Sequence, residues 1–229
     1  MTLKKIILFC NSLLIIFFNI SYGQNQVTVA PVIGIYLYNS ENSLPVMGDK
    51  NYLFNYGFEC NYENKSLFGY DIQISYSYLY SSVDSVIEFE IYDPSPNPSP
   101  YRFLNTNASL SFNNLDISLN GNLGSIFSFG FGPSFAIVNR SIIVEKADVD
   151  REDFEDKLAS FNIGLIGLID MRIPFSKSIE YWYFYTGMKI RYLHGFFYDE
   201  GIRDLDDYDQ NFVTANLAIG IGYNFYKQI

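Results

Sequence analysis

The segment "ANLAIGIGYNF", residues 215–225, alternates between two kinds of side chain. In a β-strand successive side chains point to opposite faces, so the segment has one bulky apolar face and one face of small or amide residues. A strand of a water-soluble protein would usually carry charged residues or Thr on its second face. The small polar face therefore predicts a tight polar interior, with the bulky face turned toward an apolar environment. The bulky set is Ala215, Leu217, Ile219, Ile221, Tyr223 and Phe225, and the small set is Asn216, Ala218, Gly220, Gly222 and Asn224.

Seven earlier segments show the same period of two, which predicts eight strands in all. They span residues 26–38, 51–62, 67–80, 106–119, 125–138, 158–173 and 180–197. Each is longer than the usual soluble strand of about 5 to 6 residues, and matches the ~9 to 11 tilted residues that cross a bilayer. Short turns at 63–66, 120–124 and 174–179 alternate with longer links at 39–50, 81–105, 139–157 and 198–210. One end of the molecule is therefore expected to carry short turns and the other end long loops.

The fourth segment changes phase at Asn113 and Asn114. Its bulky residues occupy even positions before this pair and odd positions after it. A β-bulge at the Asn pair would restore a single apolar face, because one extra residue reverses the alternation. The even set is Ala108, Leu110 and Phe112, and the odd set is Leu115, Ile117 and Leu119.

These patterns predict an all-β fold, an eight-stranded antiparallel up-and-down transmembrane β-barrel. In lipid every backbone donor and acceptor needs a partner, so a sheet can span only when it closes on itself. Eight strands enclose an interior that side chains just fill, which explains the small residues. A secreted β-sandwich would also alternate, but its second face would carry solvated charges.

Residues 1–23 are predicted to be a secretory signal peptide, because two lysines precede an apolar run, Ile6 to Ile20, that is followed by Ser21-Tyr22-Gly23. Residues 24–229 then form one barrel domain. Cleavage would remove Lys4 and Lys5 and change the formal net charge from −10 to −12. So acidic a chain argues against a nucleic-acid partner, since phosphate binding needs clustered Lys and Arg.

Seven charged residues share the inward phase of the predicted strands, four acids and three bases. A narrow, largely dehydrated lumen penalises unpaired charge, so we expect a salt-bridge network that closes the lumen and fixes the strand register. Lys189 and Arg191 are expected to reach Asp71, Asp116 or Glu59. A gated ion path and a catalytic carboxylate pair are the alternatives. The seven residues are Glu59, Asp71, Asp116, Asp170, Arg172, Lys189 and Arg191.

Other chemistry has weaker support in the sequence. His194 is the only histidine and lies in "LHGFFYDE", with no Ser two residues further on, so we expect it at the rim or facing lipid. The acidic segment 199–209 resembles calcium ligands in spacing but lacks the glycine and closing glutamate of a calcium loop. We expect no catalytic residue, cofactor or bound metal; a weak divalent-cation site in the loops is the alternative.

Three segments resemble the eight-stranded outer-membrane β-barrel proteins of the OmpA-like and PorT-like kind in Gram-negative bacteria. They are "LSFNNLDISL" (110–119), "FGFGPSFAIV" (129–138) and "GIGYNF" (220–225). The resemblance implies the cell outer membrane as location, lipid and lipopolysaccharide as surroundings, and the barrel assembly machinery as a partner during biogenesis. Members commonly end on an aromatic assembly signal, whereas this chain continues past Phe225 and Tyr226.

The expected function is that of a monomeric, non-catalytic outer-membrane barrel with a filled lumen and long acidic external loops. Its role would be structural, in adhesion or in support of the envelope. A lipid-modifying barrel enzyme that uses His194 and a small channel are the alternative functions.

Overall fold

The computed structural model describes residues 24–37, 52–67, 70–90, 101–124, 126–145, 154–176, 179–198 and 211–225. Within these ranges no helix is long and apolar enough to cross a membrane. The predicted signal peptide, residues 1–23, lies outside the described part of the chain. The strands are β1 (Gln24–Leu37), β2 (Tyr52–Leu67), β3 (Tyr70–Glu90), β4 (Tyr101–Leu123), β5 (Phe127–Glu145), β6 (Phe154–Ser176), β7 (Ile179–Tyr198) and β8 (Asn211–Phe225).

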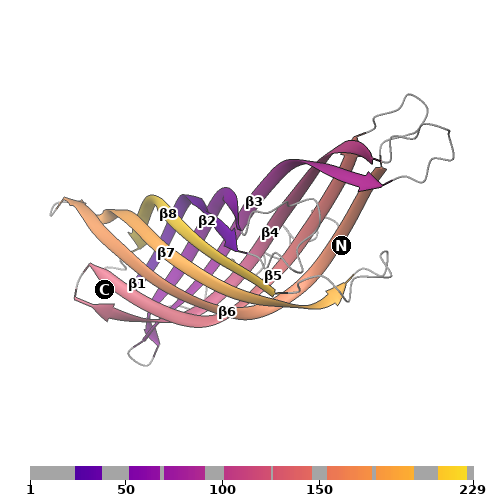
Figure 1. Ribbon diagram of the computed structural model, residues 1–229. Coiled ribbons are helices and arrows are strands. Elements are labelled where there is room, and N and C mark those ends of the chain that lie inside the picture. Colours follow the sequence, from indigo (N-terminus) through magenta and orange to yellow (C-terminus); the bar gives the residue numbers. More distant parts are fainter. Residues whose placement is uncertain are drawn as a thin grey trace, which may run out of the picture.

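The eight strands form one closed barrel in sequence order (Figure 1). Every neighbouring pair is antiparallel, and β8 closes the barrel by pairing with β1, where Asn25 lies opposite Phe225. Closure gives each strand a hydrogen-bonding partner on both sides, which a sheet in hydrocarbon requires. The predicted eight-stranded up-and-down barrel is confirmed.

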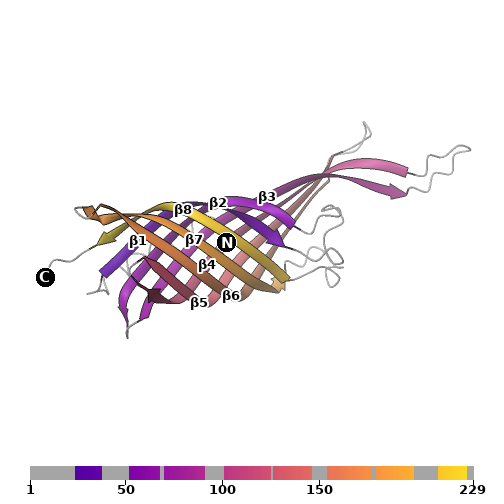
Figure 2. The same ribbon diagram turned by 60° about the vertical axis from the view of Figure 1, so that its left-hand side comes forward.

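The register of the barrel sets how steeply its strands run. A circuit of paired residues that starts at Asn25 returns to β1 at Ile35, ten residues further along. With a rise of about 3.3 Å per residue and about 4.8 Å between strands, this offset tilts the strands by about 41° from the barrel axis. The tilt is visible in Figure 2.

The two faces of the wall separate as the alternation predicts. In β8, Ile219 and Ile221 are exposed, whereas Ala218 and Asn216 are buried. In β7, Trp182, Phe184, Met188, Ile190 and Tyr192 face outward, and Tyr183, Tyr185, Lys189 and Arg191 face inward. A wall with large apolar side chains outside and polar ones inside is the reverse of a soluble protein and suits a hydrocarbon surrounding.

Aromatic side chains border this apolar band. Toward the end with the short turns, Trp182, Tyr223 and Phe225 form a cluster in which Tyr223 lies 4.9 Å, ring centre to ring centre, from each of the other two. Tyr192 marks the other border, ten residues along β7 from Trp182. At the tilt given above this separation is about 25 Å along the barrel axis, the height of the apolar band of outer-membrane barrels.

The predicted β-bulge at Asn113 and Asn114 is wrong. Both residues continue the regular pairing with β3 and β5, without a register shift. Phe112 and Leu110 instead point inward and are buried, while Leu115, Ile117 and Leu119 point outward. The apolar residues change faces because the interior of the barrel changes from polar to apolar at this level.

Beyond this level the wall has the polarity of a soluble protein. On β3 and β4, Ser82, Asp84, Ser109 and Ser111 lie on the outer face, where Asn107 also donates a 2.6 Å hydrogen bond to Asp84. The inner face of the same strands is largely apolar, although Ser81 is also buried there. It carries Leu79, Ala108, Leu110 and Phe112, all at most 2% exposed.

Several strands are longer than predicted, and two links are correspondingly shorter. β3 and β4 remain paired as far as Glu90 and Tyr101, inside the link predicted at 81–105. β5 and β6 likewise pair as far as Val144 and Phe154. In Figures 1 and 2 these four strands reach beyond the closed part of the barrel, on the side of the long links.

Candidate functional site: the barrel lumen

The lumen is lined by the inward row of every strand, and glycines make room for its larger side chains. A Cβ on Gly187 would lie 2.2 Å from the hydroxyl oxygen of Tyr185, and a Cβ on Gly222 would lie 2.0 Å from the Tyr183 ring. The small residues of the sequence pattern therefore leave the space that the tyrosine side chains occupy.

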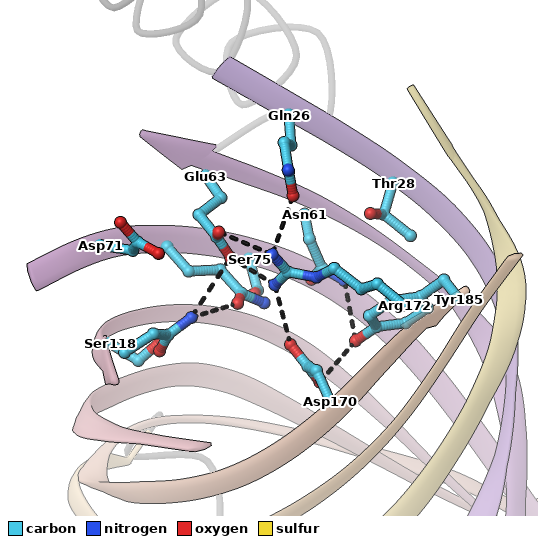
Figure 3. Close-up of polar contacts among 12 residues, drawn as sticks. Gln26, Thr28, Asn61, Glu63, Asp71, Ser75, Ser118, Asp170, Arg172 and Tyr185 are labelled. Atoms are coloured by element: carbon cyan, nitrogen blue, oxygen red, sulfur yellow. Dashed lines mark hydrogen bonds and ion pairs between the residues drawn. The ribbon is translucent and has the colours of Figure 1, made fainter. Parts of the chain in front are cut away.

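The first polar layer lies near the short turns and is centred on Arg172 of β6 (Figure 3). Its guanidinium group forms a bidentate ion pair with Glu63 of β2, through Nη1 at 2.6 Å and through Nη2. Nη1 also donates to Gln26 of β1 at 2.8 Å. The pair thus ties strands on opposite sides of the barrel together.

The next layer contains Lys189 of β7, the only buried lysine among the side chains that the structure describes. Its Nζ lies 3.0 Å from Glu59 Oε2 and donates to Asn61 Oδ1 at 2.8 Å and Ser75 Oγ at 3.0 Å. Lys189 and Glu59 are each 1% exposed. The ammonium group therefore has three oxygen partners and no contact with bulk solvent.

Arg191 of β7 reaches across the same level to Asp116 of β4. Nε lies 3.1 Å from both carboxylate oxygens and Nη2 lies 2.7 Å from Oδ2. Ser134 donates to Asp116 Oδ1 at 2.6 Å, and Arg191 Nη2 donates to Ser77 at 3.2 Å. A buried pair with this many hydrogen bonds compensates the cost of removing two charges from water.

Two further carboxylates lack such a bidentate partner among the described side chains. Asp170 of β6 is 0% exposed; it contacts Tyr185 Oη at 2.9 Å and, at 3.4 Å, the Arg172 Nη2 that Glu63 already engages. Asp71 of β3 accepts a 2.6 Å hydrogen bond from Asn122. The lumen therefore has more acid than base at these levels.

An apolar layer closes the lumen on the side of the long links. Tyr36, Phe112 and Phe212 form a triangle of rings with centroids 5.6, 5.6 and 5.8 Å apart. Arg140 covers it, with its guanidinium carbon 4.8 Å from the centre of the Phe212 ring. Ionic layers thus fill one half of the barrel and an apolar layer fills the other.

The structure places all seven sequence-predicted charged residues on the inward face. It brings together Lys189 with Glu59, Arg191 with Asp116, and Arg172 with Asp170, whereas Asp71 accepts a hydrogen bond from Asn122 instead. Sequence reasoning missed Glu63 and Arg140, because each was assigned to a turn or link. Continuing the alternation past 62 and 138 would have placed both on the inner face.

Outside the lumen, the described residues offer little for catalysis or metal binding. His194 is half-buried near the loop-side end of β7, where its Nδ1 lies 2.8 Å from Asn211 Oδ1. Within the described ranges, no group of three or more His, Cys, Asp or Glu side chains could hold a metal ion. The acidic segment 199–209 lies outside them.

Comparison with known proteins gives likeness of fold alone. No family model and no curated protein matches the sequence. Three solved structures align over most of the chain with 11% identity each. Neisserial surface protein A covers 87% of this chain and 97% of its own, with a TM-score of 0.47. A major outer membrane protein from Thermus thermophilus covers 89% and 100%, at 0.49. Ail, the attachment invasion locus protein of Yersinia pestis, covers 90% and 100%, at 0.45.

The strand order, register and outward apolar rows of this chain decide its fold. It is an eight-stranded barrel of the outer-membrane type. The sequence resemblance predicted the same architecture, which the closed antiparallel topology confirms.

Proposed function

We propose that this chain is an integral outer-membrane barrel, monomeric and non-catalytic, whose lumen is filled and whose sheet continues beyond the bilayer into water. The barrel anchors the exposed part of β3–β6 and the acidic links at the cell surface. Its role is structural, in adhesion or in support of the envelope.

The observation that carries this proposal is the exchange of polarity between the two faces of the wall. On β4, the outward residues are apolar at Leu115, Ile117 and Leu119, and polar at Ser109 and Ser111. The inward residues change in the opposite sense at the same level. A wall that is apolar outside for about 25 Å and polar outside thereafter matches a strand that leaves hydrocarbon for water.

The lumen geometry favours a closed barrel over a channel or an enzyme. Ion pairs and their hydrogen-bonded partners cross the interior at two levels, and the ring triangle crosses it at a third. The one histidine is bonded to Asn211. The carboxylates of the described lumen are buried, since Glu59, Glu63, Asp116 and Asp170 are each at most 3% exposed and Asp71 is 8% exposed.

Single cysteines on β4 test where the bilayer ends. In a Cys60→Ser background, Ser111→Cys is expected to react in intact membranes with a maleimide that cannot cross lipid, and Ile117→Cys is expected to react at least tenfold more slowly. The reason is that a thiolate forms in water and not in hydrocarbon. Ile117 and Ser111 share one face, so the two variants differ in depth alone.

The reagent is a polyethylene glycol maleimide, and the fraction of each variant whose gel mobility is shifted gives the labelled fraction. Equal labelling of the two positions would contradict the proposed bilayer boundary. Recovery of the unmodified protein in the soluble periplasmic fraction would contradict the membrane assignment itself.

A further inference from the structure

The phenol of Tyr185 lies between two buried carboxylates. Its hydroxyl oxygen is 2.9 Å from Asp170 Oδ1 and accepts a 3.2 Å hydrogen bond from Asn61 Nδ2 (Figure 3). The same oxygen is 3.1 Å from Glu59 Oε1. A phenol has one hydrogen to donate. With both carboxyls ionised, one of the two oxygen contacts would set acceptor against acceptor in a site without solvent.

The charges of this part of the lumen independently indicate that one carboxyl group has no cation to balance it. Four carboxylates, each at most 3% exposed, surround three cations. Lys189 pairs with Glu59, Arg191 with Asp116 and Arg172 with Glu63, which leaves Asp170 as the carboxyl in excess among these four. The fifth lumen carboxyl, Asp71, is more exposed, at 8%, and accepts a hydrogen bond from Asn122. Burying an unpaired carboxylate is costly, and such a group usually takes up a proton instead.

We propose that Asp170 is a buried proton-binding site. Its carboxyl group keeps a proton at neutral pH and donates it to Tyr185 Oη, and the Tyr185 hydroxyl donates in turn to ionised Glu59. In this arrangement each oxygen contact has one donor and one acceptor. The three cations then balance three carboxylates.

The position of the proton follows from the neighbours of each acid. Glu59 faces the Lys189 ammonium group at 3.0 Å, which stabilises its ionised form. Asp170 faces Tyr185 from β7 and, on its own strand, the Arg172 group engaged by Glu63 of β2. Lys189 of β7 and Glu59 of β2 are further charged groups that act on Asp170. Tyr183 of β7 is also nearby, with its hydroxyl 2.7 Å from Thr28 Oγ1. Ser128 of β5, the neighbour in register, carries no charge.

Stability should therefore depend on pH through this residue. In the unfolded chain an ordinary aspartate is ionised above about pH 3.9. The folded chain then holds one more proton at this site than the unfolded chain, so the stabilisation is lost as the pH rises. For one proton, the unfolding equilibrium constant of the wild type relative to Asp170→Asn should rise about tenfold per pH unit from pH 5 upward.

Infrared spectroscopy of the folded barrel in detergent micelles tests the proposal directly. At neutral pH the wild type should show the C=O stretching band of a protonated carboxyl group, shifted in D₂O, and Asp170→Asn should lack it. Tyr185→Phe should move the band, because the carboxyl loses its acceptor. Tyr183→Phe is the matched control and should leave the band in place.

A wild type without the band, or a band that persists in Asp170→Asn, overturns the proposal. If Asp170→Asn does not fold, the comparison of Tyr185→Phe with Tyr183→Phe decides, and an unmoved band in Tyr185→Phe overturns it. The test needs a folded barrel and does not depend on the cellular role proposed above.

Discussion

At the scale of single residues, the pair of Arg191 and Asp116 shows why the lumen tolerates charge. Both side chains are 1% exposed, and the bidentate contact leaves each with hydrogen-bonded partners in several directions. The attraction within such a pair roughly offsets the cost of desolvation. Removal of one member of the pair therefore destabilises the barrel, chiefly because the other member remains buried and charged.

Arg191→Met should destabilise the barrel by about 3–5 kcal/mol, because it leaves the Asp116 carboxylate buried and unpaired. The double variant Arg191→Met with Asp116→Asn should recover most of this loss, since neither residue is then charged. Urea unfolding in lipid vesicles measures both. A double variant as unstable as the single one would mean that packing of the Arg191 stem, and not charge, stabilises this layer.

At the scale of the element, β4 shows how much could be read from the sequence and where reading failed. The alternation in each segment gave eight strands, their faces and seven of the inward charges, because period two is a local property of strand geometry. The phase change at Asn113 was visible too. Its interpretation as a bulge failed because local pattern cannot tell a reversed face from a reversed environment.

The same reasoning explains the missed parts of the site. Glu63 and Arg140 lie where the sequence turns polar, and polar residues near a turn suggest a loop. Strand pairing extends past both positions in the structure. Which acid pairs with which base depends on contacts across the barrel between residues such as Arg191 and Asp116, 75 positions apart in the chain, and no local pattern contains that information.

The two halves of the lumen should act as barriers in series. Asp116→Ala with Arg191→Ala removes one ionic bridge but leaves the triangle of Tyr36, Phe112 and Phe212 intact. Phe112→Ala with Phe212→Ala opens the triangle but leaves the bridge. Neither double variant should give stable conductance steps in planar bilayers, since an apolar constriction and a filled ionic layer each exclude hydrated ions and the Arg172–Glu63 layer remains in both.

Variants for this measurement are first checked for folding by their gel mobility before and after heating. Stable steps in either double variant would show that the remaining layer is no barrier.

At the scale of the whole molecule, stability depends on closure, and the seam between β1 and β8 is where the chain closes. The pairing of these strands is interrupted between Val29 opposite Ile221 and Val32 opposite Ala218. Pro31 lies in this gap and has no backbone N–H to donate. Gly220 faces Ala30 there, and a Cβ on Gly220 would lie 2.3 Å from the Val29 carbonyl oxygen and 2.5 Å from the Ala30 Cβ.

Gly220→Val should therefore prevent or greatly slow closure, because its side chain must displace the backbone of β1. Gly167→Val is the matched control: Gly167 is also a strand glycine, but it faces outward and a Cβ there meets nothing within 4 Å. Refolding into lipid vesicles, followed by gel mobility with and without heating, measures the closed fraction. The control should fold as the wild type does, and the Gly220 variant should remain in the unfolded band. Equal folding of the two variants would show that the seam can widen, and that closure does not need the close approach of β8 to β1.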